Sequence, residues 1–169
     1  MVTGCSQKAP ELESASAGST IADTNPELRA DSDIAKMEGV DENSAYGSVD
    51  ERIAAVAKEI EPIYFATDQY RIPEDQIYKI DKAAQIFNGE LARDLSIRVE
   101  GNCDEWGTDE YNYALGLKRA KSAKDALSIS GVAEGRMSLI SYGESKPVCM
   151  EHNEACWRRN RRVDFTLLP

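Results

Sequence analysis

The chain has 169 residues, of which 41% are hydrophobic, enough for one ordinary domain with a buried core. Its formal net charge is −10, and the first 50 residues, with ten acids against three bases, carry −7 of that charge. No basic patch is long enough to follow a phosphate backbone, so we expect no nucleic-acid partner. No run is apolar and long enough to span a bilayer.

The first 48 residues predict a disordered acidic tether. From residue 6 onward this stretch is rich in Ser, Ala, Gly, Asp and Glu and has no sustained apolar period, so it cannot bury enough surface to order itself. Residues 49–169 are the expected folded domain. It opens with a short helix over residues 49–60, because apolar side chains recur there at helical spacing.

The first half of the domain predicts a strand over residues 60–65, then a helix, then a second strand. Pro73 opens the helix and Asn88-Gly89 ends it. Its expected buried stripe consists of Ile77, Ile80, Ala84 and Phe87. The second strand runs to Gly101, with Ile97 and Val99 facing inward and Arg98 and Glu100 facing outward.

The second half predicts a long helix from about Asp109 to Gly131, a strand over residues 137–142, a short polar helix or loop over 152–160 and a last strand near 163–167. The inward stripe of the long helix is expected to consist of Tyr113, Gly116, Ala120, Ala123 and Leu127. This order gives an α/β fold, a two-layer sandwich with a mixed four-stranded sheet and helices packed on it.

The stretch IRVEGNCDEWGTDEYNYALGLKRA, residues 97–120, reads as strand, polar turn and helix. Asp104 lies in the turn, while Asn112 and Arg119 are seven residues apart and share one helix face. An acid, an amide and a guanidinium in one place suit a ligand that carries both an ammonium and a carboxylate, with Asp104 pairing the first and Arg119 the second. On spacing alone, a capping Asp and a solvated Arg explain the same residues.

The segment GNCDEWGTDEYNYALGLKRA resembles the signature of the OmpA-like peptidoglycan-binding domain. Cys before Asp, and Ala-Leu-Gly before the basic pair, make it most similar to the peptidoglycan-associated lipoproteins of that family. The resemblance continues through SYGESKP at residues 141–147 and NRRVDF at 160–165. It covers about residues 60–168, with several motifs in the right order.

The resemblance implies that the domain binds the diaminopimelate side chain of the peptidoglycan stem peptide without a covalent bond. Asp104 and Arg119 stand at matching positions and are expected to line a groove rather than the core. Asn112 and Arg161 of NRRV are the further expected contacts. The resemblance also shows two departures: Trp106 stands where such sequences usually have Arg, and Ala66 replaces the first Asp of the loop motif Phe-Asp-x-Asp.

The resemblance further implies a protein without catalytic residues, metal or cofactor, held at the outer membrane with its domain in the periplasm. Val2-Thr3-Gly4-Cys5 resembles the end of a bacterial lipobox, so Cys5 is the expected lipidation site, and we expect that the preceding signal was trimmed. The implied partners are peptidoglycan, the outer membrane, and TolB with other Tol proteins.

The remaining cysteines leave alternatives open. Cys149 and Cys156 bracket a short loop and, in an oxidising periplasm, are the expected disulfide, which is similar to that of some relatives. A zinc site built with His152 is the rival. Two other functions stay open: a hydrolase with Cys103 as nucleophile and His152 as base, and a protein-docking module that does not bind the wall.

Overall fold

The computed structural model describes residues 47–169, and every structural statement below concerns that part of the chain. The predicted tether, apart from its last two residues, and the lipidation residue Cys5 lie outside the described residues. The elements, in chain order, are α1 (Val49–Ala57), β1 (Ile63–Tyr64), the 3₁₀ turn η1 (Glu74–Gln76), α2 (Ile77–Asn88), β2 (Ser96–Asn102), α3 (Asp109–Ile129), the 3₁₀ turn η2 (Glu134–Arg136), β3 (Met137–Gly143), α4 (Glu154–Asn160) and β4 (Arg162–Leu168).

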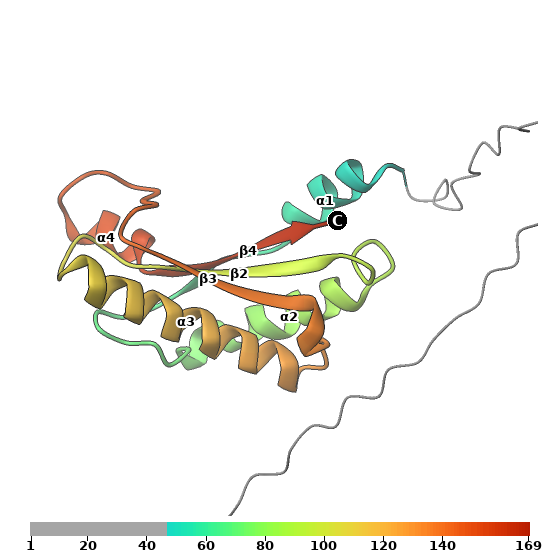
Figure 1. Cartoon of the computed structure of the whole chain (residues 1–169), viewed down its shortest axis with the longest axis horizontal. Coiled ribbons are helices and arrows are strands. Elements are labelled where there is room, and N and C mark those ends of the chain that lie inside the picture. The colour runs from blue at the N-terminus through green and yellow to red at the C-terminus, as the bar shows by residue number, and fades with distance from the viewer. Residues whose placement is uncertain (1–46) are drawn as a thin grey trace, which may run out of the picture. The chain divides into compact units, whose positions relative to one another are not determined.

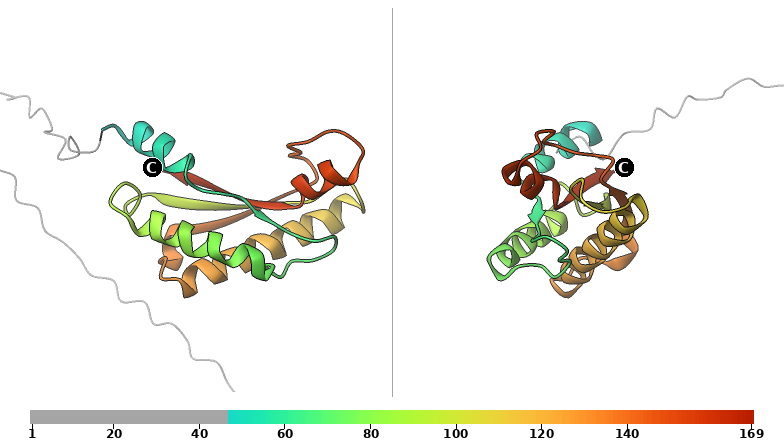
Figure 2. Two further views of the ribbon diagram at one scale, coloured as in Figure 1. Left: turned by 180° about the vertical axis from the view of Figure 1, so that it is seen from behind. Right: turned by 90° about the vertical axis from the view of Figure 1, so that its left-hand side faces the viewer.

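The four strands form one mixed sheet in the order β1-β4-β2-β3, which confirms the predicted fold class. β2 and β3 are parallel, and α3 makes the crossover that a parallel pair requires. β4 runs antiparallel to both of its neighbours. Helices α2 and α3 lie along one face of the sheet, and α1 lies beside the opposite face, as Figure 1 and the end-on view of Figure 2 show.

The core lies between the sheet and the pair α2 and α3. Ile97, Val99 and Val163 from the strands are fully buried there together with Phe87 of α2 and Leu127 of α3. Burial of such side chains contributes roughly 1.5–3 kcal/mol each, so this layer carries most of the stability.

α3 and β2 meet backbone to backbone at two glycines. A Cβ atom on Gly101 would overlap the carbonyl oxygen of Gly116, and a Cβ on Gly116 would overlap the hydroxyl of Ser141. The helix can therefore cross the strand closely only because both positions lack a side chain. This contact fixes where the rest of α3 stands relative to the end of β2.

Several predicted faces are wrong in detail. Tyr113 is 55% exposed rather than inward, and Leu115 is buried instead. Ile77 is 47% exposed, because it stands in the first turn of α2, while Ala83 takes a place in the core. The first strand shrinks from residues 60–65 to a two-residue pairing with β4, a partner that only the tertiary fold supplies.

Glu100 is the largest departure, since it was expected to face solvent and is completely buried. Its carboxylate accepts hydrogen bonds from Arg98 Nε at 2.9 Å, Lys146 Nζ at 2.6 Å and Thr166 Oγ1 at 2.7 Å. Burial raises the pKa of Glu100, but the hydrogen bonds from Lys146, Thr166 and Arg98 outweigh it and hold the pKa below its ordinary value. The polar face of the sheet is thus tied to the segment after β3.

The two ends of the sheet differ in what they carry. α1 and the C-terminus lie together at one end, and α4 lies at the other end beside the connection between β2 and α3 (Figures 1 and 2). Within residues 47–169, no helix is long and apolar enough to cross a membrane.

Candidate functional site

The candidate site lies at the end of the sheet where β2 passes into α3. The Thr108 side chain accepts a hydrogen bond from the Tyr111 backbone N–H and caps the helix, which begins at Asp109 as predicted. The loop of residues 103–108 therefore stands directly over the first turns of α3. The structure brings all four predicted site residues to this end, and all are nearly inaccessible to solvent: Asp104, Asn112, Arg119 and Arg161 are 6%, 1%, 0% and 4% exposed.

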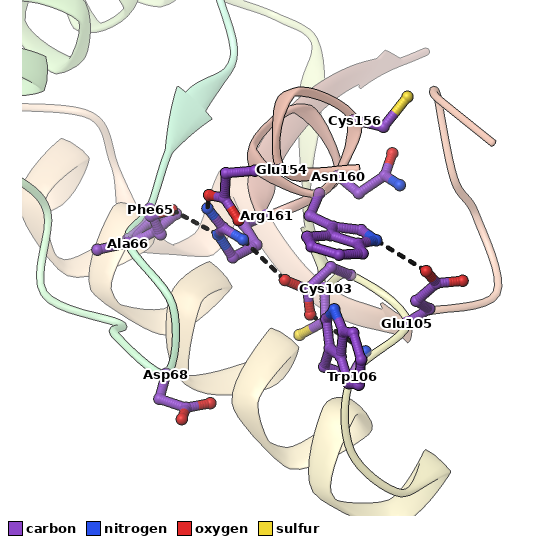
Figure 3. A network of polar contacts seen from close by, with 12 residues as sticks. Phe65, Ala66, Asp68, Cys103, Glu105, Trp106, Glu154, Cys156, Asn160 and Arg161 are labelled. Atoms are coloured by element: carbon purple, nitrogen blue, oxygen red, sulfur yellow. Dashed lines mark hydrogen bonds and ion pairs between the residues drawn. The ribbon is translucent and has the colours of Figure 1, made fainter. Parts of the chain in front are cut away.

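Asp104 and Arg161 form an ion pair. Arg161 Nη1 donates to Asp104 Oδ2 at 2.9 Å, Nη2 donates to Glu154 Oε1 at 2.7 Å, and Nε donates to the Phe65 carbonyl at 3.2 Å (Figure 3). Burial lowers the pKa of Arg161, but the hydrogen bonds to Glu154 and Asp104 outweigh it and raise the pKa overall. Arg161 is thus a cation paired with two carboxylates, and it holds that of Asp104 in place.

Arg119 is held in a different way, by backbone carbonyls. Its Nε donates to the Gln69 carbonyl at 2.8 Å, Nη1 to the Asn102 carbonyl at 2.9 Å, and Nη2 to the Ala66 carbonyl at 3.1 Å. Nη1 also donates to the Cys103 sulfur at 3.4 Å, and the guanidinium lies 5.4 Å from the centre of the Phe65 ring. Burial lowers the pKa of Arg119. An arginine nevertheless stays charged at neutral pH.

No carboxylate within residues 47–169 forms an ion pair with Arg119. The four hydrogen bonds leave one of its five N–H donors without a partner among the described residues. A buried charge is normally paired, because its desolvation is expensive. This one has no carboxylate of the described residues in direct contact, and Asp104 and Asp68 favour its charge only through space.

The expectation that Arg119 lines a groove rather than the core is wrong. The side chain is wholly enclosed, because the loop after β1 folds over it and contributes the carbonyls of Ala66 and Gln69. The same loop is fastened to α3 where Tyr111 donates its hydroxyl to Asp68 at 3.2 Å. Asp68 has a φ of 55°, a left-handed backbone that Asp tolerates better than most residues. The loop departs from the family motif, yet its backbone positions Arg119.

Asn112 connects the loop to the segment after β3. Its amide nitrogen donates to the Asp104 carbonyl at 3.3 Å and also to the Glu144 carboxylate. The Asn112 carbonyl accepts a hydrogen bond from the Cys103 thiol at 3.2 Å. The Asn112 amide therefore links the loop that carries Asp104 to Glu144 after β3.

The geometry does not favour a hydrolase. Cys103 is buried, and burial raises its pKa to about 11, so the thiol is protonated at neutral pH and is a weak nucleophile. The imidazole Nδ1 of His152 lies 2.7 Å from Glu105 Oε1, and this contact raises the pKa of His152. The Cys103 thiol bonds to the Asn112 carbonyl and His152 contacts Glu105, so the proposed nucleophile and base do not bond to each other.

Cys149 and Cys156 form a disulfide with their Cα atoms 5.0 Å apart, which confirms that pairing. The zinc alternative is wrong, since both sulfurs are consumed in the bond. Asn160 holds the disulfide loop by accepting from the Val148 and Cys149 N–H groups at 3.0 and 3.1 Å and donating to the Cys149 carbonyl at 2.7 Å.

Sequence reasoning missed Glu154, Glu144 and Glu105. Glu144 stands within the SYGESKP motif, which was the available signal for it. Glu105 stands next to Asp104 in the segment GNCDEWG, which was the available signal for it. Glu154 carries no local signal, because its role depends on Arg161, which the fold brings to it.

A groove of about 910 Å³ opens beside this cluster. Arg161, Phe65 and Ala66 line it, so the groove reaches the residues that hold both arginines. Arg158 and Arg159 of α4 line it as well, so the groove carries further positive charge beside Arg161. Asp104, Asn112 and Arg119 do not line the groove, so a ligand that enters it meets Arg161 first.

A mixed four-stranded sheet with this buried Asp and Arg constellation defines a domain of the OmpA class. Residues 64–161 match the OmpA family, and the chain belongs to it. Its relatives include the peptidoglycan-associated lipoprotein of Pasteurella multocida, 44% identical over 101 residues, a match that spans 60% of this chain and 66% of that protein.

Two further comparisons agree. The peptidoglycan-associated lipoprotein of Pseudomonas aeruginosa is 36% identical over 133 residues, covering 75% of this chain and 77% of that one. The crystal structure of the peptidoglycan-associated lipoprotein from Burkholderia pseudomallei superimposes with a TM-score of 0.60 at 38% identity, covering 63% of this chain and 89% of that chain.

Proposed function

We propose that this protein is a non-enzymatic lipoprotein of the outer membrane that binds peptidoglycan noncovalently and so links the membrane to the cell wall. The ligand is the diaminopimelate side chain of the stem peptide, taken by Asp104 and Arg119 with Asn112 and Arg161 in support. The names of the relatives and the membership in the OmpA family support the wall as the target.

The observation that carries the proposal is the buried charge of Arg119, which has no carboxylate partner among the described residues. A ligand carboxylate would supply the missing counter-charge at the one N–H that the carbonyls leave free. A bidentate contact between Arg119 and the ligand carboxylate would also require the loop of Ala66 and Gln69 to move away. The carbonyls of that loop accept hydrogen bonds from the Arg119 Nε and Nη2 groups.

Asp104 supports the opposite end of the ligand. Its Oδ2 bonds to Arg161, and within residues 47–169 its Oδ1 accepts one hydrogen bond, from the Trp106 backbone N–H at 3.4 Å. A carboxylate has about four acceptor positions, so Asp104 retains capacity for an ammonium. Cation and anion side by side match a zwitterionic amino acid head group and discriminate against a ligand of one sign.

The arrangement of the ends supports the linking role. The described chain starts at the end of the sheet opposite the site, so a chain anchored through Cys5 would leave the site free to face the wall (Figure 1). Acyl chains on Cys5 would supply the membrane affinity, since each buried methylene contributes about 0.8 kcal/mol and one chain alone anchors weakly. TolB and other Tol proteins are the proposed protein partners.

The test is sedimentation with purified peptidoglycan. Asp104→Asn keeps the shape of the side chain and removes its charge, so the ammonium loses its partner at a cost of about 2–5 kcal/mol. Since each 1.4 kcal/mol is a factor of ten, wall binding should weaken at least about thirtyfold. Walls that carry lysine in place of diaminopimelate lack the side-chain carboxylate and should also bind poorly.

Asp94→Asn is the matched control. Asp94 pairs with the buried Arg52 of α1 as Asp104 pairs with Arg161, but it belongs to the other end of the sheet. This variant should bind like wild type. Equal sedimentation of wild type and Asp104→Asn, or equal binding of lysine walls, would refute the stem-peptide site. Failure of wild type to sediment would leave a protein-docking module as the function.

A further inference from the structure

The two tryptophans of the chain stand together at the rim of the candidate site. The ring centres of Trp106 and Trp157 lie 5.3 Å apart with an angle of 78° between the planes, so the rings form two walls of a corner. We call this pair the tryptophan corner. Trp106 is 60% exposed, and its ring therefore presents open aromatic surface to solvent.

The tryptophan corner is tied directly to the loop that carries Asp104. The Trp106 backbone N–H donates to Asp104 Oδ1, and Trp157 Nε1 donates to Glu105 Oε1 at 2.7 Å. Figure 3 shows Trp106 and Glu105 close to Cys103, on the same side of Arg161. A ligand held at Asp104 would thus have its next chemical group within reach of the two rings.

A small pocket lies on the Trp157 side of the corner, and Trp106 stands outside it. It has a volume of about 270 Å³, and its lining includes Trp157, Met150, Pro147, His152 and the acidic residues Glu105, Glu144 and Glu151. Pockets that enclose whole drug-sized ligands hold about 300–1,000 Å³, so this one suits a single ring or a short substituent. Met150 is itself 83% exposed and extends the apolar rim.

Aromatic faces surrounded by carboxylates match the surface of a sugar. A pyranose ring has a face of C–H bonds, which pack against the electron-rich face of an indole, and an edge of hydroxyl and amide N–H donors, which carboxylates accept. Tryptophan and methionine are also enriched in protein interfaces, but Glu is depleted there, whereas Glu105, Glu144 and Glu151 all line this pocket. The corner is narrow and acidic at its margin.

We propose that the tryptophan corner binds the N-acetylated amino-sugar strand of the wall polymer, next to the stem-peptide site. This inference rests on the proposed function, because the sugar strand is covalently joined to the peptide that Asp104 and Arg119 receive. The protein then contacts both the sugar strand and the stem peptide of the polymer. The corner adds affinity and sets the direction in which the strand leaves the site.

The first experiment uses intrinsic fluorescence. Because Trp106 and Trp157 are the only tryptophans in the sequence, all tryptophan emission comes from the corner. Titration of the wild-type protein with a tetramer of β-1,4-linked N-acetylglucosamine, which has no peptide, should change the emission saturably. Trp106→Ala should lose the response and remain folded, since the side chain is mostly exposed. Tyr78→Ala, at 58% exposure on α2, is the matched control and should respond like wild type.

The second experiment measures affinities by calorimetry for a diaminopimelate tripeptide and for the same tripeptide joined to its disaccharide. Wild type should bind the disaccharide form about tenfold more tightly, the scale of one favourable aromatic contact. Trp106→Ala should keep the tripeptide affinity and lose the tenfold preference.

The outcomes separate the two proposals. Equal affinity of wild type for both ligands, an absent saccharide response, or an equal loss of both affinities in Trp106→Ala would overturn the sugar site. Absent tripeptide binding together with a saturable saccharide response would refute the stem-peptide site and support the corner as a carbohydrate site.

Discussion

Replacing Arg119 with lysine should destabilise the domain strongly, although the charge is kept. The guanidinium donates to three carbonyls from separate segments, those of Ala66, Gln69 and Asn102. A lysine carries its donors on one nitrogen and cannot match a planar fork, so we expect it to satisfy one carbonyl and orphan two. A buried carbonyl left without a partner costs about 1–3 kcal/mol. The Asn102 carbonyl is buried, whereas the Ala66 and Gln69 carbonyls belong to exposed loop residues and can bond to water, so we expect a total loss of roughly 1–3 kcal/mol.

This loss is a sizeable share of the 5–15 kcal/mol typical of a domain, and it should lower the unfolding midpoint by roughly 5 °C or more. The assay is urea unfolding of residues 47–169 joined to their natural N-terminal segment, with the free energy of unfolding compared between wild type and Arg119→Lys. Arg158→Lys makes the same chemical change at an exposed position of α4 and should stay within about 0.5 kcal/mol. A change in Arg119→Lys as small as that of the control would refute the anchoring role of the three carbonyls.

Three other predictions follow from the same contacts and from the sequence. The pKa of Glu100 is lowered in the folded state, so the ionised carboxylate stabilises the fold. This contribution is complete above the unfolded pKa of about 4.3 and is lost as the pH falls through the folded value. Glu100→Gln should therefore flatten the dependence of stability on pH in that acidic range. Removing the disulfide with the double variant Cys149→Ala and Cys156→Ala should lower the free energy of unfolding by about 2–3 kcal/mol, because the closed loop is short, and an unchanged urea midpoint would contradict this. Expressed with a full signal in a bacterium with two membranes, the protein should carry three acyl chains on Cys5 by intact-mass analysis, and an unmodified soluble protein would exclude the lipid anchor.

Local chemistry was sufficient to predict the elements around the site. Thr108 and Asp109 carry capping and charge signals that act within one helical turn, and α3 begins where they place it. The period-2 pattern of Ile97 and Val99 gave the strand before it, and both residues are buried. These signals succeed because the interactions behind them join residues that are near neighbours in the chain.

The motifs also predicted which residues would gather, but not how they would be engaged. Asp104, Asn112, Arg119 and Arg161 do come to one end of the sheet. Their partners are the carbonyls of Ala66 and Gln69 and the carboxylates of Glu154 and Glu144, which lie on other segments. No pattern local to the motif contains that information.

The sequence by itself determined the order of the elements and the start of α3, because both depend on backbone preference and on short spacing. Only the tertiary structure decided which polar groups are buried. Glu100 and Arg119 look like surface charges in the sequence, yet Lys146 and Thr166 enclose the first and the loop after β1 encloses the second. Burial of a charge depends on partners 46 to 66 residues away, and their positions follow from packing of the whole sheet.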